Sequence, residues 1–432
     1  MENFDRSIAP AIQPISIPTI PLPEHTALAG GAQCYAIRQG TEAIVGLDVY
    51  LPNSFGTNGQ NLAQGSDVIF PLNSLVGRML PEGTATRSAQ QVQEQIAQLG
   101  GFLEVGSSIY HTSLSLFCLP QHLPALLPVL ADVLEAPKFA EAEWKIQQQQ
   151  MLQSLEVNRQ KTAWLAGTAF NKAIYGEHPF GHSLLEADIE DLNTATLAAH
   201  YSDKMQPVAP TIFMTGQFAD SQLALVQSHF AGKYAQAEVL AEPSYGQSDE
   251  GLLEIEKADS TQITIRAGLR TIGRQHKDYW ALRILTEIFG GFFGSRLMKN
   301  IREEKGLTYG ISARLSPFKD VGHLVIGTDV NKENYQLAIA EIRHEMSRLQ
   351  QDLVTDDEMA LVRNHMLGDF ASTLGTPFGT AEKWKNIVLN GLPDTFYADY
   401  LDAIRSVTPE QLRAAAQAHY RPNGLVVVAA GV

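Results

Sequence analysis

The sequence predicts an α+β fold built from two duplicated αβ domains, each an antiparallel-rich sheet covered by helices. Three observations lead to this prediction. Segments in which apolar and polar residues alternate, as in half-buried strands, occur in both halves beside longer segments of helical periodicity. Each half ends in the same unit, a helix closing on His-Tyr (AAHY at 198–201, QAHY at 417–420) before an apolar strand. The strands also outnumber the crossover connections that a fully parallel sheet needs.

The first half, residues 1–232, is expected to begin with an extended Pro- and Ile-rich segment over residues 1–28. A loop rich in Gly and Asn follows the second strand at 53–65, and Ser88 is a candidate helix cap. We expect strands at 34–38, 43–51, 102–105, 110–119 and 211–216. We expect helices at 67–80, 84–99, 123–135, 141–159, 163–175 and 221–230.

Residues 233–250 lack apolar periodicity and are interpreted as a linker, and residues 251–432 as the second domain. The second domain repeats the pattern of the first. We expect strands at 252–256, 262–269, 309–315 and 322–329, before the final apolar strand. We expect helices at 279–289, 295–304, 334–350 and 356–374, with further short helices up to residue 420.

Composition excludes some classes of function. A formal net charge of -15 argues against a surface that neutralises nucleic-acid phosphates. Cys34 and Cys118 lie in apolar, strand-like segments, so two buried free thiols are expected rather than a disulfide framework. The N-terminus lacks the pattern of a signal peptide, and no run of about 18 apolar residues occurs. A cytoplasmic protein is expected, or a periplasmic one if a leader precedes the sequence.

The stretch 290–313 (GGFFGSRLMKNIREEKGLTYGISA) carries the most specific pattern. By itself it is typical of an amphipathic, core-packing helix with a solvated arginine. Its four short elements, however, resemble in order and spacing the C-terminal half of the pitrilysin/insulinase-like zinc peptidases, the inverzincins, which include the mitochondrial processing peptidase. These elements are Gly290-Gly291, Ser295-Arg296-Leu297, Ile301-Arg302-Glu303 and Gly306-Leu307-Thr308-Tyr309. The resemblance extends from about residue 30 to the end, and it implies a clamshell-like arrangement of the two domains.

The zinc motif of that family, H-x-x-E-H, is absent from this chain, because none of the 12 histidines belongs to it. Alignment on the family pattern places the two histidines and the base on Ser74, Arg78 and Gly77. The third ligand falls on Ser154, and a supporting glutamate falls on Gln147. A hydroxyl is a poor zinc ligand, glycine cannot act as a base, and a guanidinium repels a cation. The resemblance therefore implies a degenerate site with no metal in this chain.

A second pair of histidines has metal-like spacing but a different context. His178 and His182 stand four residues apart, yet Pro179 and Gly181 between them prevent a helix that would present both rings on one face. The HPxGH sequence resembles a structural turn of the same family, which is the interpretation we favour.

In this family some enzymes are heterodimers in which one subunit has lost the zinc motif but retains the Arg and Tyr. The resemblance implies such a subunit here, with Arg302 and Tyr309 binding a peptide substrate in trans and zinc held by an active homologue. The alternative is a structural or peptide-binding homologue, possible also as a homodimer, whose edge strand at 102–105 pairs with an extended peptide. A third hypothesis is an autonomous peptidase with an unfamiliar metal site.

Overall fold

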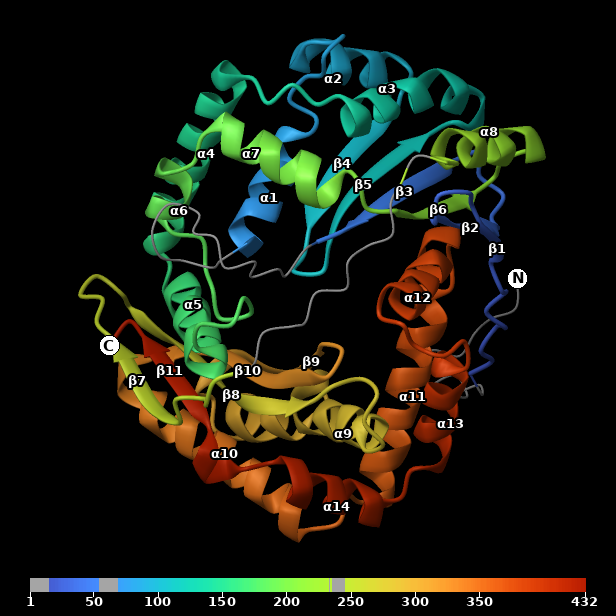
Figure 1. Ribbon diagram of the computed structural model, residues 1–432. Coiled ribbons are helices and arrows are strands. Elements are labelled where there is room, and N and C mark those ends of the chain that lie inside the picture. The colour runs from blue at the N-terminus through green and yellow to red at the C-terminus, as the bar shows by residue number, and fades with distance from the viewer. Residues whose placement is uncertain (1–14, 54–68, 233, 235–244) are drawn as a thin grey trace, which may run out of the picture.

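The computed structural model describes residues 15–53, 69–232, 234 and 245–432. Two sheets lie in two halves of the molecule, with helices on their outer sides (Figure 1). Each half therefore combines a mixed sheet with helices, and the predicted α+β fold with two αβ units is confirmed. None of the described helices is long and apolar enough to cross a membrane.

The first sheet has the order β1-β2-β6-β3-β5-β4. Strands β2 and β6 are parallel, whereas the other neighbours are antiparallel. Its strands are β1 (Glu24–Ala27), β2 (Gln33–Arg38), β3 (Val45–Pro52), β4 (Phe102–Ser107), β5 (His111–Cys118) and β6 (Thr211–Gly216).

The second sheet has the order β7-β11-β8-β10-β9, with β7 and β11 parallel. Its strands are β7 (Gly251–Ile255), β8 (Gln262–Ile272), β9 (Thr308–Pro317), β10 (Val321–Asn331) and β11 (Val426–Ala430). If β1 is set aside and the other five strands of each sheet are numbered in chain order, both sheets have the strand order 1-5-2-4-3. The repeat seen in the sequence is thus a repeat of topology, and β4 and β9 are the equivalent edge strands.

The described helices of the first half are α1 (Ile69–Met79), α2 (Ala89–Gln98), α3 (Leu123–Glu135), α4 (Glu141–Arg159), α5 (Thr162–Tyr175), α6 (Glu186–Glu190), α7 (Thr194–His200) and α8 (Asp220–Phe230). Those of the second half are α9 (Tyr279–Thr286), α10 (Tyr335–Gln351), α11 (Asp356–Thr373), α12 (Pro377–Leu389), α13 (Phe396–Ser406) and α14 (Pro409–His419). Two π-helical turns, η3 (Glu287–Gly291) and η4 (Met298–Glu304), lie between α9 and β9.

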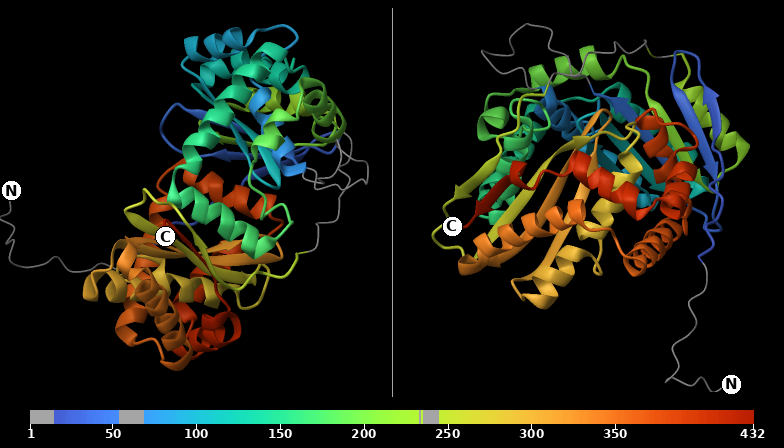
Figure 2. Two further views of the ribbon diagram at one scale, coloured as in Figure 1. Left: turned by 90° about the vertical axis from the view of Figure 1, so that its left-hand side faces the viewer. Right: turned by 90° about the horizontal axis from the view of Figure 1, so that it is seen from below.

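The two halves exchange one helix each. Helix α5 packs on β8 and β11 of the second sheet, and α12 packs on β6 and β2 of the first. The first contact is apolar and buries Phe170 of α5 with Val428 of β11. The second contains an ion pair between Lys385 Nζ and Asp48 Oδ2 at 2.9 Å, with both side chains buried. Figure 2 shows α5 between the halves. Part of each sheet is therefore covered by a helix of the other half.

Most predicted elements are present, with differences at several places. The helix expected from residue 84 begins at Ala89, where Ser88 is the cap that the sequence predicted and forms a capping box with Gln91. Thr84 is held outside the helix, because it pairs with Pro137 and its hydroxyl donates to Asp132 Oδ2 at 2.8 Å. Part of the N-terminal segment predicted to be extended forms a regular strand, β1, which pairs with β2, and residues 1–14 lie outside the described residues.

Other expectations concern single segments. Helix α6 was not predicted, whereas α7 is the helix expected to close on His-Tyr at 198–201. The helix expected over 279–289 is α9 up to Thr286 and continues as the π-helical turn η3. Cys34 and Cys118 are both buried and free, as predicted. Most of the predicted loop at 53–65 and most of the predicted linker lie outside the described residues, and the domain boundaries stay a prediction.

Candidate functional site

Helix α1 carries the three positions where the family pattern places its zinc motif. The helix packs against the edge of the first sheet, at β4 and β5, and against α7 and α4. Ser74 is half-buried, Gly77 is buried and Arg78 is exposed. None of the three side chains is a good donor to zinc or a general base, so α1 itself supplies no metal-binding chemistry.

Gly77, which stands at the position of the family's base, packs closely against the first sheet. A Cβ atom placed on Gly77 would lie 3.1 Å from Cγ2 of Thr112 and 3.6 Å from Cγ1 of Val105. Thr112 is fully buried, and its hydroxyl donates to Asn53 Oδ1 at 2.9 Å. Because the nearer contact is tighter than ordinary van der Waals packing, the close approach of α1 to β5 favours glycine at this position.

A buried histidine lies beside α1, but it does not face a metal site. His200 at the end of α7 places Nε2 2.7 Å from Oδ1 of Asn73, and both residues are buried. Burial lowers the pKa of His200 to about 4, with a smaller contribution from Lys204. The neutral imidazole therefore serves as a fixed hydrogen-bond partner of α1. The sequence placed His200 in the helix-end repeat but gave no sign of this contact.

Helix α4 does not complete a metal site either. Ser154 is exposed, while Nε2 of Gln147 donates to Glu82 Oε1 at 2.9 Å. Burial and the nearby Glu143 raise the pKa of Glu82, and the bond from Gln147 opposes that shift. In the part of the chain that the structure describes, a single group of His, Cys, Asp and Glu side chains is arranged to hold a metal, and it lies far from α1, in the second half.

The histidines of the HPxGH turn face different partners. Nδ1 of His178 accepts a hydrogen bond from the Phe180 backbone N–H at 3.2 Å, and its ring packs on Tyr245. Nε2 of His182 lies 2.9 Å from Asp188 Oδ2. The two imidazoles thus stabilise the turn and its neighbours, as the interpretation from the sequence proposed.

Arg302 and Tyr309, which the sequence singled out, lie together in the structure. Arg302 belongs to η4, and Tyr309 is the second residue of β9. Cζ of Arg302 lies 5.7 Å from the centre of the Tyr309 ring, and the tyrosine side chain is 93% exposed. Tyr309 is therefore available to bind an extended peptide or another protein, and the half-buried Arg302 lies directly beside it.

A third side chain joins this pair. Phe293, in the loop before η4, is 63% exposed, and its ring centre lies 4.5 Å from Cζ of Arg302. The guanidinium is thus held by cation–π contacts to two exposed rings. No role for Phe293 was predicted from the sequence. The available signal was an aromatic residue placed between the glycine pair and the SRL element.

A network of charged and amide side chains holds η4 in place. Nδ2 of Asn300 donates to Glu345 Oε1 at 2.7 Å and to Glu341 Oε2 at 3.0 Å. Nζ of Lys305 donates to Asn300 Oδ1 at 2.7 Å, which closes the network. Just before η4, Arg296 is buried and forms two hydrogen bonds to Glu358, of 2.8 and 3.1 Å. These bonds hold the turn that presents Arg302.

The predicted peptide-binding strand is an edge of the first sheet. Strand β4 pairs with β5 on one side and is last in the strand order. Phe102 at its start is 59% exposed. An edge strand of this kind has backbone groups available to pair with a peptide.

Comparisons with known proteins agree with this architecture. The sequence profile described as Insulinase (Peptidase family M16) matches residues 72–188, and the Peptidase M16 inactive domain matches residues 191–366. The chain is 24% identical to the uncharacterized zinc protease YmxG of Bacillus subtilis, over 80% of this chain and 85% of that protein. It is 22% identical to the non-peptidase homolog YmxG of Helicobacter pylori, over 82% and 83% respectively.

Solved structures show the same fold. A Pseudomonas fluorescens protein described as a peptidase M16 inactive domain superimposes with a TM-score of 0.83 at 22% identity, covering 95% of this chain and 98% of that one. A Helicobacter pylori protein described as a protease superimposes with a TM-score of 0.82 at 15% identity, covering 96% and 100%.

Proposed function

This chain belongs to the M16 (insulinase) peptidase family, and from that premise we propose that it is the non-catalytic subunit of a heterodimeric zinc peptidase. The partner is an active homologue that carries H-x-x-E-H and holds the zinc ion. This chain supplies Arg302 and Tyr309, which bind the peptide substrate at the partner's active site. No metal takes part in catalysis within this chain.

The observation that carries the proposal is the contrast between the two candidate sites. On α1 the donor side chains are replaced by Ser74, Gly77 and Arg78, and Gly77 packs too closely on Thr112 for a larger side chain to enter without movement. In the second half, Arg302 and Tyr309 are retained side by side, with Arg302 half-buried and Tyr309 exposed. A chain that could hydrolyse peptides by itself needs the first site, whereas a chain that assists a partner needs only the second.

The chemistry of the retained pair suits a role in trans. Peptide hydrolysis develops a negative oxygen in the transition state, and donors positioned near it lower the barrier. The guanidinium of Arg302 donates to a substrate carbonyl, and the hydroxyl of Tyr309 donates to the same backbone or to the developing oxyanion. Phe293 limits the orientations open to the guanidinium before the substrate arrives.

The names of relatives support both parts of this proposal. One relative is called a non-peptidase homolog and several others are called zinc proteases. A family in which both kinds occur provides an active partner for an inactive chain.

The alternative function is that of a structural or peptide-binding homologue without a role in proteolysis, in a homodimer or with another partner. One observation favours it: Arg302 already packs against Phe293 and Tyr309 within the isolated chain, so the arginine has a packing role without any substrate.

The decisive experiment mixes this chain with an H-x-x-E-H homologue from the same genome and measures peptide cleavage. We expect no cleavage by this chain alone, with or without a chelator, and cleavage by the equimolar mixture. Arg302→Ala in the mixture should lower kcat by about 100-fold, the usual loss for one transition-state donor. Lys299→Ala is the matched control, because Lys299 is exposed on the same turn and should leave cleavage unchanged.

Two further variants separate the two functions. Tyr309→Phe should lower kcat while retaining assembly, because it removes only the hydroxyl. Phe293→Ala should lower kcat about threefold, the equivalent of an exposed cation–π contact of about 0.5–1 kcal/mol.

Unchanged cleavage in Arg302→Ala, with normal assembly, would reject the role in trans and leave the structural homologue as the better description.

A further inference from the structure

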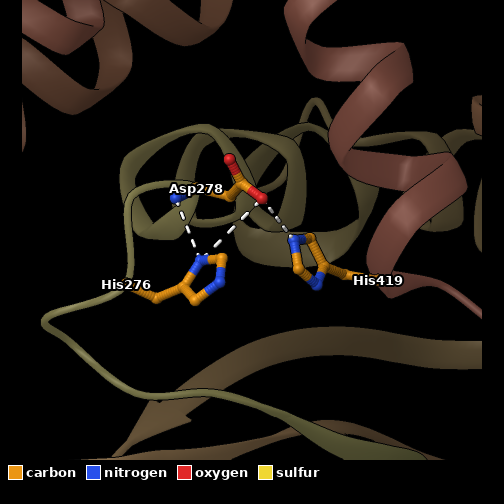
Figure 3. A group of neighbouring side chains, drawn as sticks. All are labelled: His276, Asp278 and His419. Carbon is orange, nitrogen blue, oxygen red and sulfur yellow. Dashed lines mark hydrogen bonds and ion pairs between the residues drawn. The ribbon is translucent and has the colours of Figure 1, made fainter.

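Three potential metal ligands converge on the outer side of the second half. His276 and Asp278 lie at the start of α9, and His419 ends α14 (Figure 3). One ligand atom from each lies within 4.8 Å of the other two, and no second group of this kind occurs among the described residues. The group is separate from α1 and from Arg302, so the proposed function does not use it.

The distances are close to those of a coordination shell. Oδ2 of Asp278 lies 3.0 Å from Nε2 of His419 and 3.8 Å from Nδ1 of His276. Ligands bonded tetrahedrally to zinc at about 2.0–2.1 Å are about 3.3 Å from one another. Small rotations of the two imidazoles, which are exposed or half-buried, are therefore enough to give metal-binding geometry.

The orientation of His276 gives a second argument. Its Nδ1 accepts a hydrogen bond from the Asp278 backbone N–H at 3.1 Å, so this nitrogen carries the lone pair. The same nitrogen faces the Asp278 carboxylate (Figure 3). A zinc ion bound at Nδ1 would replace the Asp278 N–H on this lone pair and would lie beside the carboxylate.

The carboxylate gives a third argument. Asp278 occupies the N-cap position of α9, where an aspartate normally accepts hydrogen bonds from the first turn, yet its side chain forms no such bond. The carboxylate is directed toward the two imidazoles instead of the helix.

We propose that His276, Asp278 and His419 bind one divalent zinc ion that clips the end of α14 to the start of α9. Two imidazoles and one carboxylate are a ligand set that zinc accepts, with water completing the shell. Tyr420 follows His419 directly and is buried with its hydroxyl 3.2 Å from that of Thr286, in α9. The ion therefore reinforces a contact that fixes the chain before its last strand, and its role is structural.

This site changes how the zinc content of the protein is to be interpreted. One equivalent of zinc in the purified chain would otherwise be assigned to α1 and taken as evidence for an autonomous peptidase. The site formed by His276, Asp278 and His419 predicts that the chain binds zinc without having peptidase activity.

The test uses the full chain without an affinity tag of histidines, titrated with zinc chloride by calorimetry, and with cobalt(II) for its absorption spectrum. We expect one equivalent to bind at pH 7.5, a higher thermal unfolding midpoint in zinc, and affinity that falls as pH is lowered through the histidine range. His276→Ala and His419→Ala should each weaken binding at least about tenfold and abolish the thermal shift.

His344→Ala is the matched control, because His344 is an exposed histidine on α10 outside the cluster. This variant should bind zinc as the wild type does. Circular dichroism of the metal-free variants checks that each is folded. Absence of stoichiometric binding to the wild type, or wild-type affinity in folded His276→Ala and His419→Ala, would overturn the proposal, and neither result bears on the role of Arg302.

Discussion

Helix α1 and turn η4 carry the two candidate sites, and both lie in the connection that leads to the edge strand of their sheet, α1 as its first helix and η4 as its last helical turn. Both are fixed by a buried asparagine, but the partners differ. Asn73 on α1 is bonded to His200, whose pKa burial lowers to about 4, so that the ring is neutral. Asn300 on η4 is bonded to two carboxylates and to Lys305.

This difference shows that the two candidate sites are held in place in different ways. Around α1, small side chains and a neutral hydrogen bond allow the helix to pack tightly on β5. Around η4, ionised groups hold the turn in place while Arg302 is half-buried and Tyr309 stays exposed. The charged network is expected to contribute more to stability than the neutral bond, because hydrogen bonds to ionised groups are stronger. Three predictions test the comparison.

The largest effect is expected for Asn300→Ala. The substitution removes a donor from Glu345, which is buried, and from Glu341. Hydrogen bonds to ionised groups contribute about 1.5–3 kcal/mol, so we expect the free energy of unfolding to fall by about 3 kcal/mol. Urea denaturation measures the loss. The exposed Lys299 provides the control, since Lys299→Ala should change the free energy by less than about 0.5 kcal/mol. A loss in Asn300→Ala no greater than the control would contradict the structural importance of the network.

A smaller effect is expected from acid at α1. Because the folded-state pKa of His200 is about 4, below the usual value of 6.5, the folded protein favours the neutral ring. The stability that depends on this group is present above about pH 6.5 and is lost as pH falls toward 4. Between pH 7 and pH 5, His200 should lower the free energy of unfolding by about 2 kcal/mol.

Denaturation of the wild type and of His200→Gln at both pH values isolates this contribution. The glutamine does not titrate, so the variant should lose about 2 kcal/mol less than the wild type over this interval. Equal losses would mean that His200 is not the group responsible.

The smallest effect concerns the closeness of α1 to the sheet. In an open helical position, Gly→Ala gains about 1 kcal/mol from helix propensity. Gly167 of α5 is such a position, with no atom within 4 Å of an added Cβ, whereas Gly77 has Thr112 Cγ2 at 3.1 Å. Gly167→Ala should therefore stabilise the protein, and Gly77→Ala should stabilise it by about 1 kcal/mol less. Equal gains in thermal or urea denaturation would show that α1 has room for a larger side chain.

Much of the fold was predictable because local patterns and tertiary packing agree. The alternation in the predicted strand at 43–51 and the periodicity of the predicted helix at 334–350 correspond to β3 and α10. Short elements such as α6 were missed because they carry too few residues for a period to be recognised. The pair Arg302 and Tyr309 was found because its residues are close in sequence. Phe293 was missed because an exposed aromatic residue in a loop has no pattern of its own.

The sequence by itself determined which chemistry is absent from α1 and which side chains remain in the second half, because the identity of a donor group is a local property of the chain. It also determined the duplication, through the repeated order of elements. Only the tertiary structure decided which distant residues meet. The exchange of α5 and α12, the pairing of Asn73 with His200, and the convergence of His276 with His419 all join segments separated by many residues. Such contacts follow from how the sheets and helices pack, and no local pattern records them.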